Sequence, residues 1–214
     1  MFCYVNSKVI HIVRFAVIVF IQNFTNGFIR LTFCGFNTDE EKKVIFQRFA
    51  LRKVFERMGM KDIEEAKTYL HEKHTAINSG KTLFYYAICL KGNNIPIGYI
   101  HVSGGDSYDL GYGLRKEFWH KGICSEACRV VIEKLKHIEI PYITATHDVN
   151  NPRSGRVMQA IGMKYRYSYN ELWQPKNKWV TFRMYQLNLD GQENRIYKKY
   201  WNKYPIHFVE TIPK

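Results

Sequence analysis

The sequence predicts an α/β (α+β) domain built on a mixed, mostly antiparallel sheet, and two observations carry this prediction. Between residues 82 and 114, short runs rich in β-branched and aromatic residues alternate with glycine-rich turns, as in a strand meander. Beyond residue 120, two helical patterns are each followed by another strand-like run. Hydrophobic residues make up 46% of the 214 residues, which is ample for a core.

The segment before the meander is predicted to hold one strand and two helices. Residues 29–36 alternate between apolar and polar side chains, as in a first strand. Thr38 and Glu41 have the spacing of a capping box, which starts a helix. The second helix starts near Asp62 and stops at Gly80, because glycine commonly ends a helix.

From residue 82 onward the predicted elements follow one another closely. The meander is predicted to contain three strands, over residues 83–90, 96–102 and 108–114. Helices and strands then alternate and end in a hairpin, with helix 125–137, strand 140–147, helix 152–161 and strands 164–169 and 179–187. Gly162 is expected to end the second of these helices.

The stretch from Tyr112 to Ala127 combines a strand end, a tight loop around Gly122 and the start of an apolar helix near Ser125. The first amides of a helix lack intrahelical partners and carry partial positive charge. Glycine lets the backbone approach a bound group closely. The order strand, glycine loop, helix is therefore typical of a phosphate site, although many helices begin after a glycine and bind nothing.

Two motifs in this part of the chain are more specific. Residues 119–127 read Trp-His-Lys-Gly-Ile-Cys-Ser-Glu-Ala, and residues 151–163 read Asn-Pro-Arg-Ser-Gly-Arg-Val-Met-Gln-Ala-Ile-Gly-Met. Together they resemble the GNAT family of N-acetyltransferases, and most closely the branch named for ribosomal-protein alanine acetyltransferases. His120 and Cys124 stand where that branch usually has small residues. The resemblance extends over roughly residues 28–189.

The resemblance implies the acyl-CoA N-acyltransferase fold, with helices on both faces of a sheet that splits between the strands near Leu114 and Ile143. The split would form a cleft for CoA, so acetyl-CoA is implied as the cosubstrate and no metal is expected. The strand end would pair with the pantetheine arm, with Gly113 permitting a bulge, and the loop would hold the pyrophosphate. The residues implied to contact CoA are Tyr112, Gly113, Leu114, His120, Lys121, Gly122, Ile123, Cys124, Ser125 and Asn151.

Transfer of an acetyl group also needs a base that deprotonates the amine. An α-amine with a pKa of about 7.8 needs little help, whereas a lysine-type amine with a pKa of about 10.4 needs a base. The candidates are Glu171 and Asp109, and the alternative for each is a solvated charge. Glu171 has the strand parity of Tyr165, Tyr167 and Tyr169, which predicts a partly apolar surrounding.

The leaving thiolate needs a hydrogen-bond donor. Many members of the family use a tyrosine, but that position is Met158 here. Ser154 matches a serine of the ribosomal-protein branch and is the predicted donor; its alternative role is that of a helix-start residue. Asn151 has a helix-capping alternative to its contact with CoA. His147 lies near these residues, and a lone histidine is more often structural.

The predicted function is acetyl-CoA-dependent N-acetylation of a primary amine, either a protein N-terminus or a small molecule such as a polyamine or an aminoglycoside-like antibiotic. One alternative is a non-catalytic acyl-CoA-binding module, since the tyrosine and one loop glycine of the family are replaced. The other is a nucleic-acid-binding protein, because the formal net charge is +13. The same charge also attracts the anionic CoA.

Three regions are predicted: an extension over residues 1–27, an N-acetyltransferase domain over residues 28–190, and a basic aromatic tail over residues 191–214. Stacking and charge would let the tail bind single-stranded nucleic acid. The favoured alternative is an amphipathic helix packed on the domain, or on the partner subunit of a homodimer. Nucleic acid is therefore not the expected partner.

The composition also bears on location. Five cysteines without a Cys-x-x-Cys pair predict reduced thiols in a cytoplasmic protein. Cys124 and Cys128 are one helical turn apart, but nothing near them completes a zinc set. The sequence contains no run of eighteen apolar residues, so no transmembrane helix is expected. Val9 to Ile21 is predicted to form a buried strand, with a membrane-surface segment as the alternative.

Overall fold

The computed structural model describes residues 4–5, 8–9, 11–13, 16–18, 29–32, 82–90, 96–174 and 177–212 of the chain. The chain divides into two compact units. Unit 1 comprises Met1–His101 and Tyr112–Ala127, and unit 2 comprises Val102–Gly111 and Cys128–Lys214.

The N-terminal extension contains short paired strands instead of the single strand predicted from Val9 to Ile21. β1 (Tyr4–Val5) pairs with β2 (Lys8–Val9), and β3 (His11–Val13) pairs with β4 (Ala16–Ile18), both antiparallel. Val13 pairs with Ala16, so the chain reverses direction between them, as in a tight hairpin. The apolar run is therefore divided where a continuous strand was expected.

The first larger sheet has the strand order β5-β6-β7-β8. Its members are β5 (Ile29–Thr32), β6 (Thr82–Leu90), β7 (Pro96–Ser103) and β8 (Leu110–Leu114). The three predicted meander strands are thus confirmed, and β5 confirms the start of the strand predicted over residues 29–36. The helices predicted from Thr38 and from Asp62 lie outside the described residues.

β8 starts two residues later than predicted, because Tyr108 still belongs to the preceding turn. Tyr108 has a positive φ of 44° and donates its amide to the Gly105 carbonyl. A non-glycine residue in the left-handed region does not continue a strand. The next residue, Asp109, forms an isolated parallel bridge with Thr144.

α3 (Ile123–Lys136) follows a short 3-10 turn, η1 (Lys116–Phe118). Its apolar stripe recurs at helical spacing and is buried, at Ile123, Ala127, Cys128, Val131, Ile132 and Leu135. The helix begins earlier than the predicted Ser125, because the Glu126 amide already bonds to the Gly122 carbonyl. Cys124 and Ser125 therefore lie in the first turn of the helix and not in the loop.

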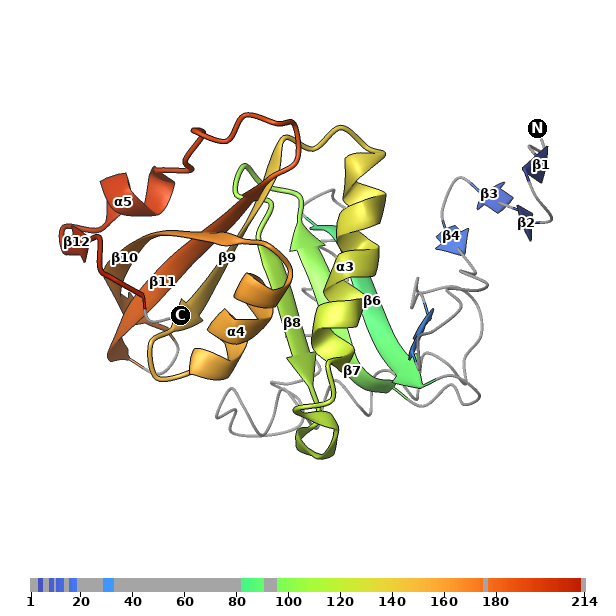
Figure 1. Ribbon diagram of the computed structural model, residues 1–214, viewed down its shortest axis with the longest axis horizontal. Helices are drawn as coiled ribbons and strands as arrows, with labels where there is room; N and C mark the ends of the chain where they lie inside the picture. Colours follow the sequence, from blue (N-terminus) through green and yellow to red (C-terminus); the bar gives the residue numbers. More distant parts are fainter. Residues whose placement is uncertain are drawn as a thin grey trace. The chain divides into compact units, whose positions relative to one another are not determined.

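The sheet of unit 2 has the order β12-β10-β11-β9, with antiparallel neighbours throughout. Its strands are β9 (Tyr142–Asp148), β10 (Lys164–Trp173), β11 (Lys178–Asn188) and β12 (His207–Phe208). α4 (Pro152–Ala160) lies against β9 and is followed by Gly162 at a φ of +87° (Figure 1). The predicted helices and strands after residue 120 are thereby confirmed, within a few residues at each end.

A bulge in β10 corrects one prediction about its faces. Tyr165 pairs with Tyr185, but Tyr167 pairs with Met184, so one extra residue lies between them on β10. Because side chains alternate along a strand, the extra residue turns Tyr165 to the opposite face from Tyr167. The prediction that Tyr165 shares a face with Tyr167, Tyr169 and Glu171 is therefore wrong for Tyr165.

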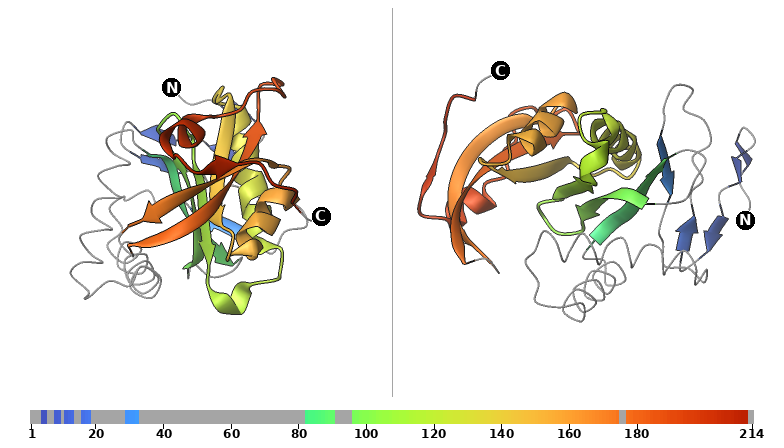
Figure 2. Two further views of the ribbon diagram at one scale, coloured as in Figure 1. Left: turned by 90° about the vertical axis from the view of Figure 1, so that its left-hand side faces the viewer. Right: turned by 90° about the horizontal axis from the view of Figure 1, so that it is seen from below.

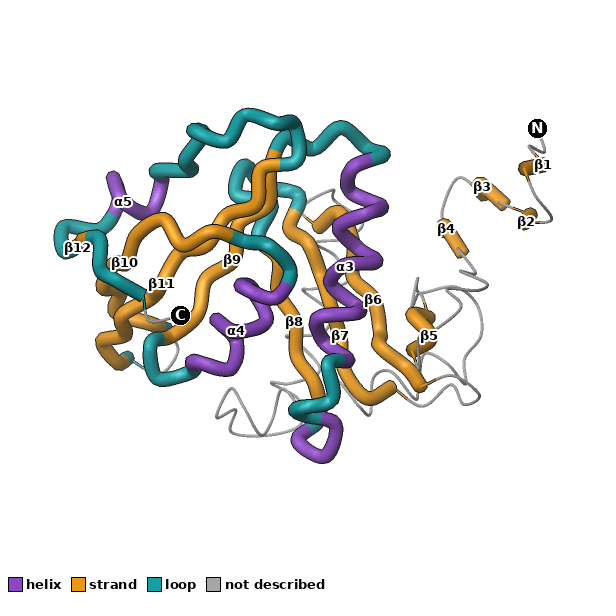
Figure 3. The backbone as a smooth tube through the Cα atoms, in the orientation of Figure 1, coloured by secondary structure: helices purple, strands orange, loops and turns teal. Residues whose placement is uncertain are grey.

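The C-terminal tail packs on unit 2, which is the favoured of its predicted alternatives. It forms only a short helix, α5 (Lys199–Lys203), before β12 adds to the edge of β10 (Figures 2 and 3). Tyr204 stacks on Tyr169 with ring centroids 4.7 Å apart, and Trp201 meets Tyr167 edge-on at 5.4 Å. Rings packed in this way give up the exposed faces that stacking on nucleic acid bases requires.

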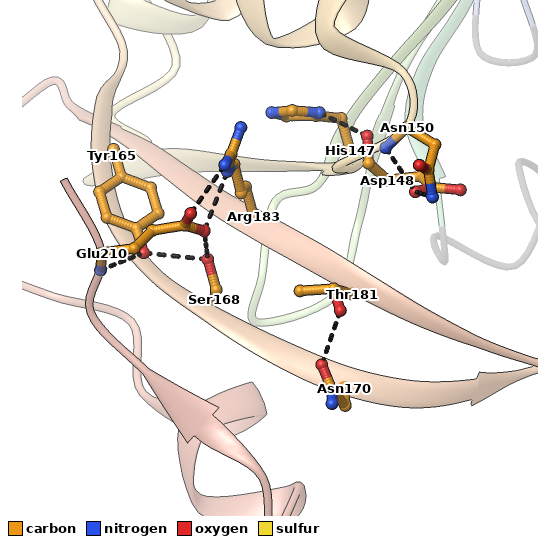
Figure 4. A network of polar contacts seen from close by, with 9 residues as sticks. All are labelled: His147, Asp148, Asn150, Tyr165, Ser168, Asn170, Thr181, Arg183 and Glu210. Atoms are coloured by element: carbon orange, nitrogen blue, oxygen red, sulfur yellow. Dashed lines mark hydrogen bonds and ion pairs between the residues drawn. The ribbon is translucent and has the colours of Figure 1, made fainter. Parts of the chain in front are cut away.

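Glu210 fixes the end of the tail to the opposite face of the same sheet (Figure 4). Its carboxylate accepts hydrogen bonds from Arg183 at 2.9 and 2.7 Å and from Ser168 at 2.6 Å. The Glu210 amide donates to the Tyr165 hydroxyl at 3.1 Å. The Arg183 guanidinium holds the pKa of Glu210 below its usual value.

Glu210→Gln is expected to destabilise the fold by about 1–3 kcal/mol at neutral pH, because charge-assisted bonds to a half-buried arginine are lost. A lowered folded-state pKa stabilises the fold fully above the ordinary glutamate pKa of about 4.3, and this stabilisation is lost as the pH falls through the folded pKa. Denaturant unfolding of the wild type and the variant, at neutral pH and at a pH below the folded pKa of Glu210, measures the difference in stability. Glu193→Gln, which breaks the exposed pair with Lys164, is the matched control with a much smaller expected effect. Equal losses of unfolding free energy in both variants would contradict the stabilising role of Glu210.

Candidate functional site

The loop before α3 has the backbone conformation that close approach to a ligand requires. His120 and Gly122 both have positive φ, 61° and 71°. Apart from its chain neighbours, no atom of the described residues would lie within 4 Å of a Cβ added at Gly122. The positive φ favours glycine at this position. The Gly122 backbone is not tightly packed and remains accessible.

Aromatic contacts brace this loop within unit 1. The Trp119 indole donates to the Leu114 carbonyl at 2.8 Å, which joins the end of β8 to the loop. The Lys121 ammonium lies 5.5 Å from the centre of the Phe118 ring, and both His120 and Lys121 are exposed. Ile123 is buried at the start of α3 and anchors the helix. A positive helix terminus, an accessible glycine and an exposed lysine together fit the pyrophosphate of CoA.

Gly113 in β8 has a packing role in this structure. A Cβ at this position would lie 2.5 Å from the Tyr99 ring, and a Cβ at Gly98 would lie 2.4 Å from the Gly113 carbonyl oxygen. Both glycines are needed for the close approach of β7 and β8. The Arg115 amide continues this pairing with a 2.8 Å bond to the Ile97 carbonyl. The predicted bulge at Gly113 and the pairing of Tyr112 to Leu114 with a ligand stay predictions.

The start of α4 holds the second motif, in unit 2. Asn151 occupies the N-cap position, but its side chain makes no capping bond; its carbonyl accepts from the Ser154 amide at 3.1 Å. Asp148 instead orders the turn, accepting from the amide and the side chain of Asn150 (Figure 4). The capping alternative for the Asn151 side chain is therefore wrong. Ser154 is half-buried in the first turn of α4.

His147 explains the glycine in the middle of the second motif. Its ring is buried, and a Cβ at Gly155 would lie 2.5 Å from its Nε2 atom. The Nδ1 atom lies 2.8 Å from the Asp148 carbonyl oxygen, and burial lowers the pKa of His147. These contacts give His147 a structural role as the residue on which α4 rests.

Asp109 has the environment of a general base. Burial raises its pKa to about 6, and its Oδ1 atom is without solvent contact or a hydrogen-bond partner among the described residues. The residue as a whole keeps some exposed surface. Burial raises the pKa of Tyr169 and of Tyr200, and the negative charge of Asp109 raises both further. A carboxyl that titrates near neutrality can hold and release a proton at working pH.

Glu171, the other predicted base, is more ordinary. It lies half-buried in β10 and accepts a hydrogen bond from the Tyr204 hydroxyl. It shares the Tyr169 neighbourhood with Asp109, because both carboxylates raise the pKa of that tyrosine. Of the two candidates, only Asp109 combines a buried, unpartnered oxygen with a pKa near neutrality.

The predicted site residues fall into two groups. The loop residues and Tyr112 to Leu114 belong to unit 1, whereas Asp109, Asn151, Ser154 and Glu171 belong to unit 2. Within unit 2, Asp109 and Glu171 are brought to one aromatic cluster, together with tail residues that sequence reasoning did not connect with them. Tyr200 is the clearest of these, and nothing local in the sequence signals its long-range contact with Asp109.

Within the described ranges, no three His, Cys, Asp or Glu side chains form a group that could hold a metal ion. Across the same part of the chain, no helix is both long and apolar enough to cross a membrane.

Comparison with known proteins identifies the family. A family model described as an acetyltransferase (GNAT) domain matches residues 30–164 of the 214. The uncharacterized N-acetyltransferase YnaD of Bacillus subtilis (strain 168) is 27% identical over 120 residues, which are 54% of this chain and 68% of that protein.

Two solved structures show the same fold. A ribosomal-protein alanine acetyltransferase from Vibrio fischeri superposes with a TM-score of 0.60 at 17% identity, covering 79% of this chain and 98% of the other. The ribosomal-protein acetyltransferase RimL in complex with coenzyme A gives a TM-score of 0.62 at 14% identity, covering 78% and 97%. The predicted α+β fold, mostly antiparallel, is thus confirmed. The chain belongs to the GNAT family and is an N-acetyltransferase that uses acetyl-CoA.

Proposed function

We propose that this enzyme transfers the acetyl group of acetyl-CoA directly to a primary amine, with the loop around Gly122 binding the pyrophosphate. The proposal is supported by the accessible backbone of this glycine at the start of α3. Exposed His120 and Lys121 add side chains that can contact phosphate oxygens. Tyr112 to Leu114, the first turn from Ile123 to Ser125, and Asn151 complete the proposed set of CoA contacts.

Asp109 is the proposed general base. In the reaction the amine nitrogen attacks the thioester carbonyl carbon, the carbon–sulfur bond breaks, and the amine proton passes to the carboxylate, directly or through water. The single observation that carries this role is the unpartnered, buried Oδ1 atom of a carboxyl whose pKa is about 6. Such a base is ionised at neutral pH and still basic enough to accept a proton in the transition state.

The acceptor is a primary amine on a protein N-terminus or a small molecule. Both classes are consistent with a base of this strength, because an α-amine with a pKa of about 7.8 is partly deprotonated at neutral pH and a more basic amine depends more on the transfer. A screen of amines for release of CoA thiol tests the proposal. Release that depends on one amine class supports it, and a rate equal to the uncatalysed rate with every class would reject it.

Ser154 is the proposed hydrogen-bond donor to the leaving thiolate. Ser154→Ala is then expected to lower kcat by roughly tenfold to 10²-fold while acetyl-CoA affinity stays nearly intact, because charge on sulfur develops only as the bond breaks. If Ser154 only starts α4, the same change should cost about 1 kcal/mol of stability and little rate. Measuring kcat, affinity and melting temperature on this variant decides between the roles. An unchanged kcat with a lowered melting temperature would reject the catalytic one.

A further inference from the structure

The C-terminal tail is bonded to the turn that leads into Asp109. The Lys199 ammonium contacts both Asp106 carboxylate oxygens, at 2.9 and 3.1 Å, and the Tyr197 hydroxyl donates to one of them at 3.1 Å. The Tyr200 hydroxyl shares a hydrogen bond with the Ser107 side chain. Three tail residues thus hold two residues of one short turn.

The turn transmits these contacts to Asp109. The Ser107 and Ser103 hydroxyls are 3.4 Å apart, and the Ser103 hydroxyl accepts from the Asp109 amide at 2.7 Å. The Ser103 amide donates to the Asp109 carbonyl at 3.0 Å, and Thr144 in β9 donates its hydroxyl to the Ser107 carbonyl at 2.8 Å. Hydrogen bonds therefore run from Ser107, which Tyr200 contacts, through Ser103 to the backbone of Asp109.

Aromatic rings of the tail also build the surroundings of this carboxyl. Tyr169 in β10 lies between two of them, with its ring centroid 5.2 Å from that of Tyr200 and 4.7 Å from that of Tyr204. The phenols that interact electrostatically with the Asp109 carboxylate are those of Tyr169 in β10 and Tyr200 in α5, and Thr144 in β9 pairs with the Asp109 backbone. All three are uncharged at neutral pH, so they exclude water without supplying a counter-ion.

We propose that the segment from Tyr197 to Tyr204 is a functional part of the active site, in which Tyr200 is a positioning residue that holds Asp109 and shields it from water. The inference rests on the proposed role of Asp109 as the base. The segment lies outside residues 30–164, which the family model matches. Removing the Tyr200 ring would admit water to Asp109 and lower its pKa from about 6 toward the ordinary value.

Carboxyl-carbon NMR titration of the isotope-labelled, full-length protein tests this directly, with Asp109→Asn used to assign the signal. In Tyr200→Ala the titration midpoint of Asp109 should fall by about one pH unit or more. The acidic limb of the pH profile of kcat/KM should shift to lower pH by the same amount. A midpoint that moves by less than this would overturn the inference. If Tyr200→Ala does not fold, Tyr200→Leu replaces it under the same criterion.

Two further variants separate positioning from general loosening of the tail. Tyr200→Phe keeps the ring and should keep the midpoint near that of the wild type. Tyr204→Ala removes the other tail ring that stacks on Tyr169, and it should lower the Asp109 midpoint by less than Tyr200→Ala does. Equal falls in Tyr200→Ala and Tyr204→Ala would reject a specific role for Tyr200. Full activity of Asp109→Asn would instead reject the proposed base, a result that the NMR midpoints do not depend on.

Discussion

Asp109→Asn is expected to lower kcat/KM by about 10²–10⁴-fold at neutral pH, which is the usual contribution of a general base. The amide keeps the size of the side chain but cannot accept the amine proton. In the wild type, activity should rise with pH as a carboxyl with a pKa of about 6 ionises, so activity is lost as the pH falls below that value. The variant should lack this acidic limb. Steady-state kinetics across this pH range measure both effects.

The control for Asp109→Asn is Glu133→Gln, which makes the same carboxylate-to-amide change on the exposed surface of α3. The control should keep both the rate and the acidic limb of the profile. Glu171→Gln provides the decisive comparison, because Glu171 shares the Tyr169 neighbourhood with Asp109. Loss of the acidic limb in Glu171→Gln, with the limb intact in Asp109→Asn, would contradict the assignment and make Glu171 the base.

Gly122→Val is expected to weaken acetyl-CoA binding by at least tenfold, which corresponds to roughly 1.4 kcal/mol. A branched residue at a φ of +71° is strained by about 1–2 kcal/mol, and its side chain would occupy the open space over the loop. Because the added Cβ would meet no atom of the described residues within 4 Å beyond its chain neighbours, the variant should still fold. Calorimetric titration with acetyl-CoA measures the change.

His120→Gly is the matched variant for this loop. His120 has the other positive φ, 61°, and glycine adopts that conformation without strain. The affinity for acetyl-CoA should therefore fall by less than in Gly122→Val, because only the proposed contact of the His120 side chain with phosphate is lost and the loop backbone is kept. Unchanged affinity in a folded Gly122→Val variant would contradict the assignment of the loop to the pyrophosphate.

The elements from residue 82 to residue 188 were predictable because their signals are local. Alternating apolar residues, glycine turns and helical spacing are properties of short windows, and β6 to β11 follow them within a few residues. The bulge between Tyr165 and Tyr167 was not predictable in this way, because it depends on how β10 registers with β11. The start of α3 at Ile123 depends likewise on the bond from Glu126 to Gly122.

In the candidate site, too, features with a local sequence signal were predictable and those that depend on long-range contacts were not. The loop around Gly122 and the Asn151 turn could be proposed from the sequence because each motif is contiguous. Asp109 was found as one of two candidate carboxylates, but its burial is produced by residues far away in the chain. Tyr200 lies 91 positions after Asp109 in the sequence. Only the folded arrangement reveals that this tail residue interacts electrostatically with the proposed base.

Acetyl transfer itself is tested most directly by following labelled acetyl groups from acetyl-CoA into a candidate amine while CoA thiol is measured in the same reaction. The account predicts that label in the amine and free thiol appear in equal amounts, at a rate that Asp109→Asn lowers by at least about 10²-fold. Acetyl-CoA that binds but passes no label to any class of primary amine above the uncatalysed rate would contradict it.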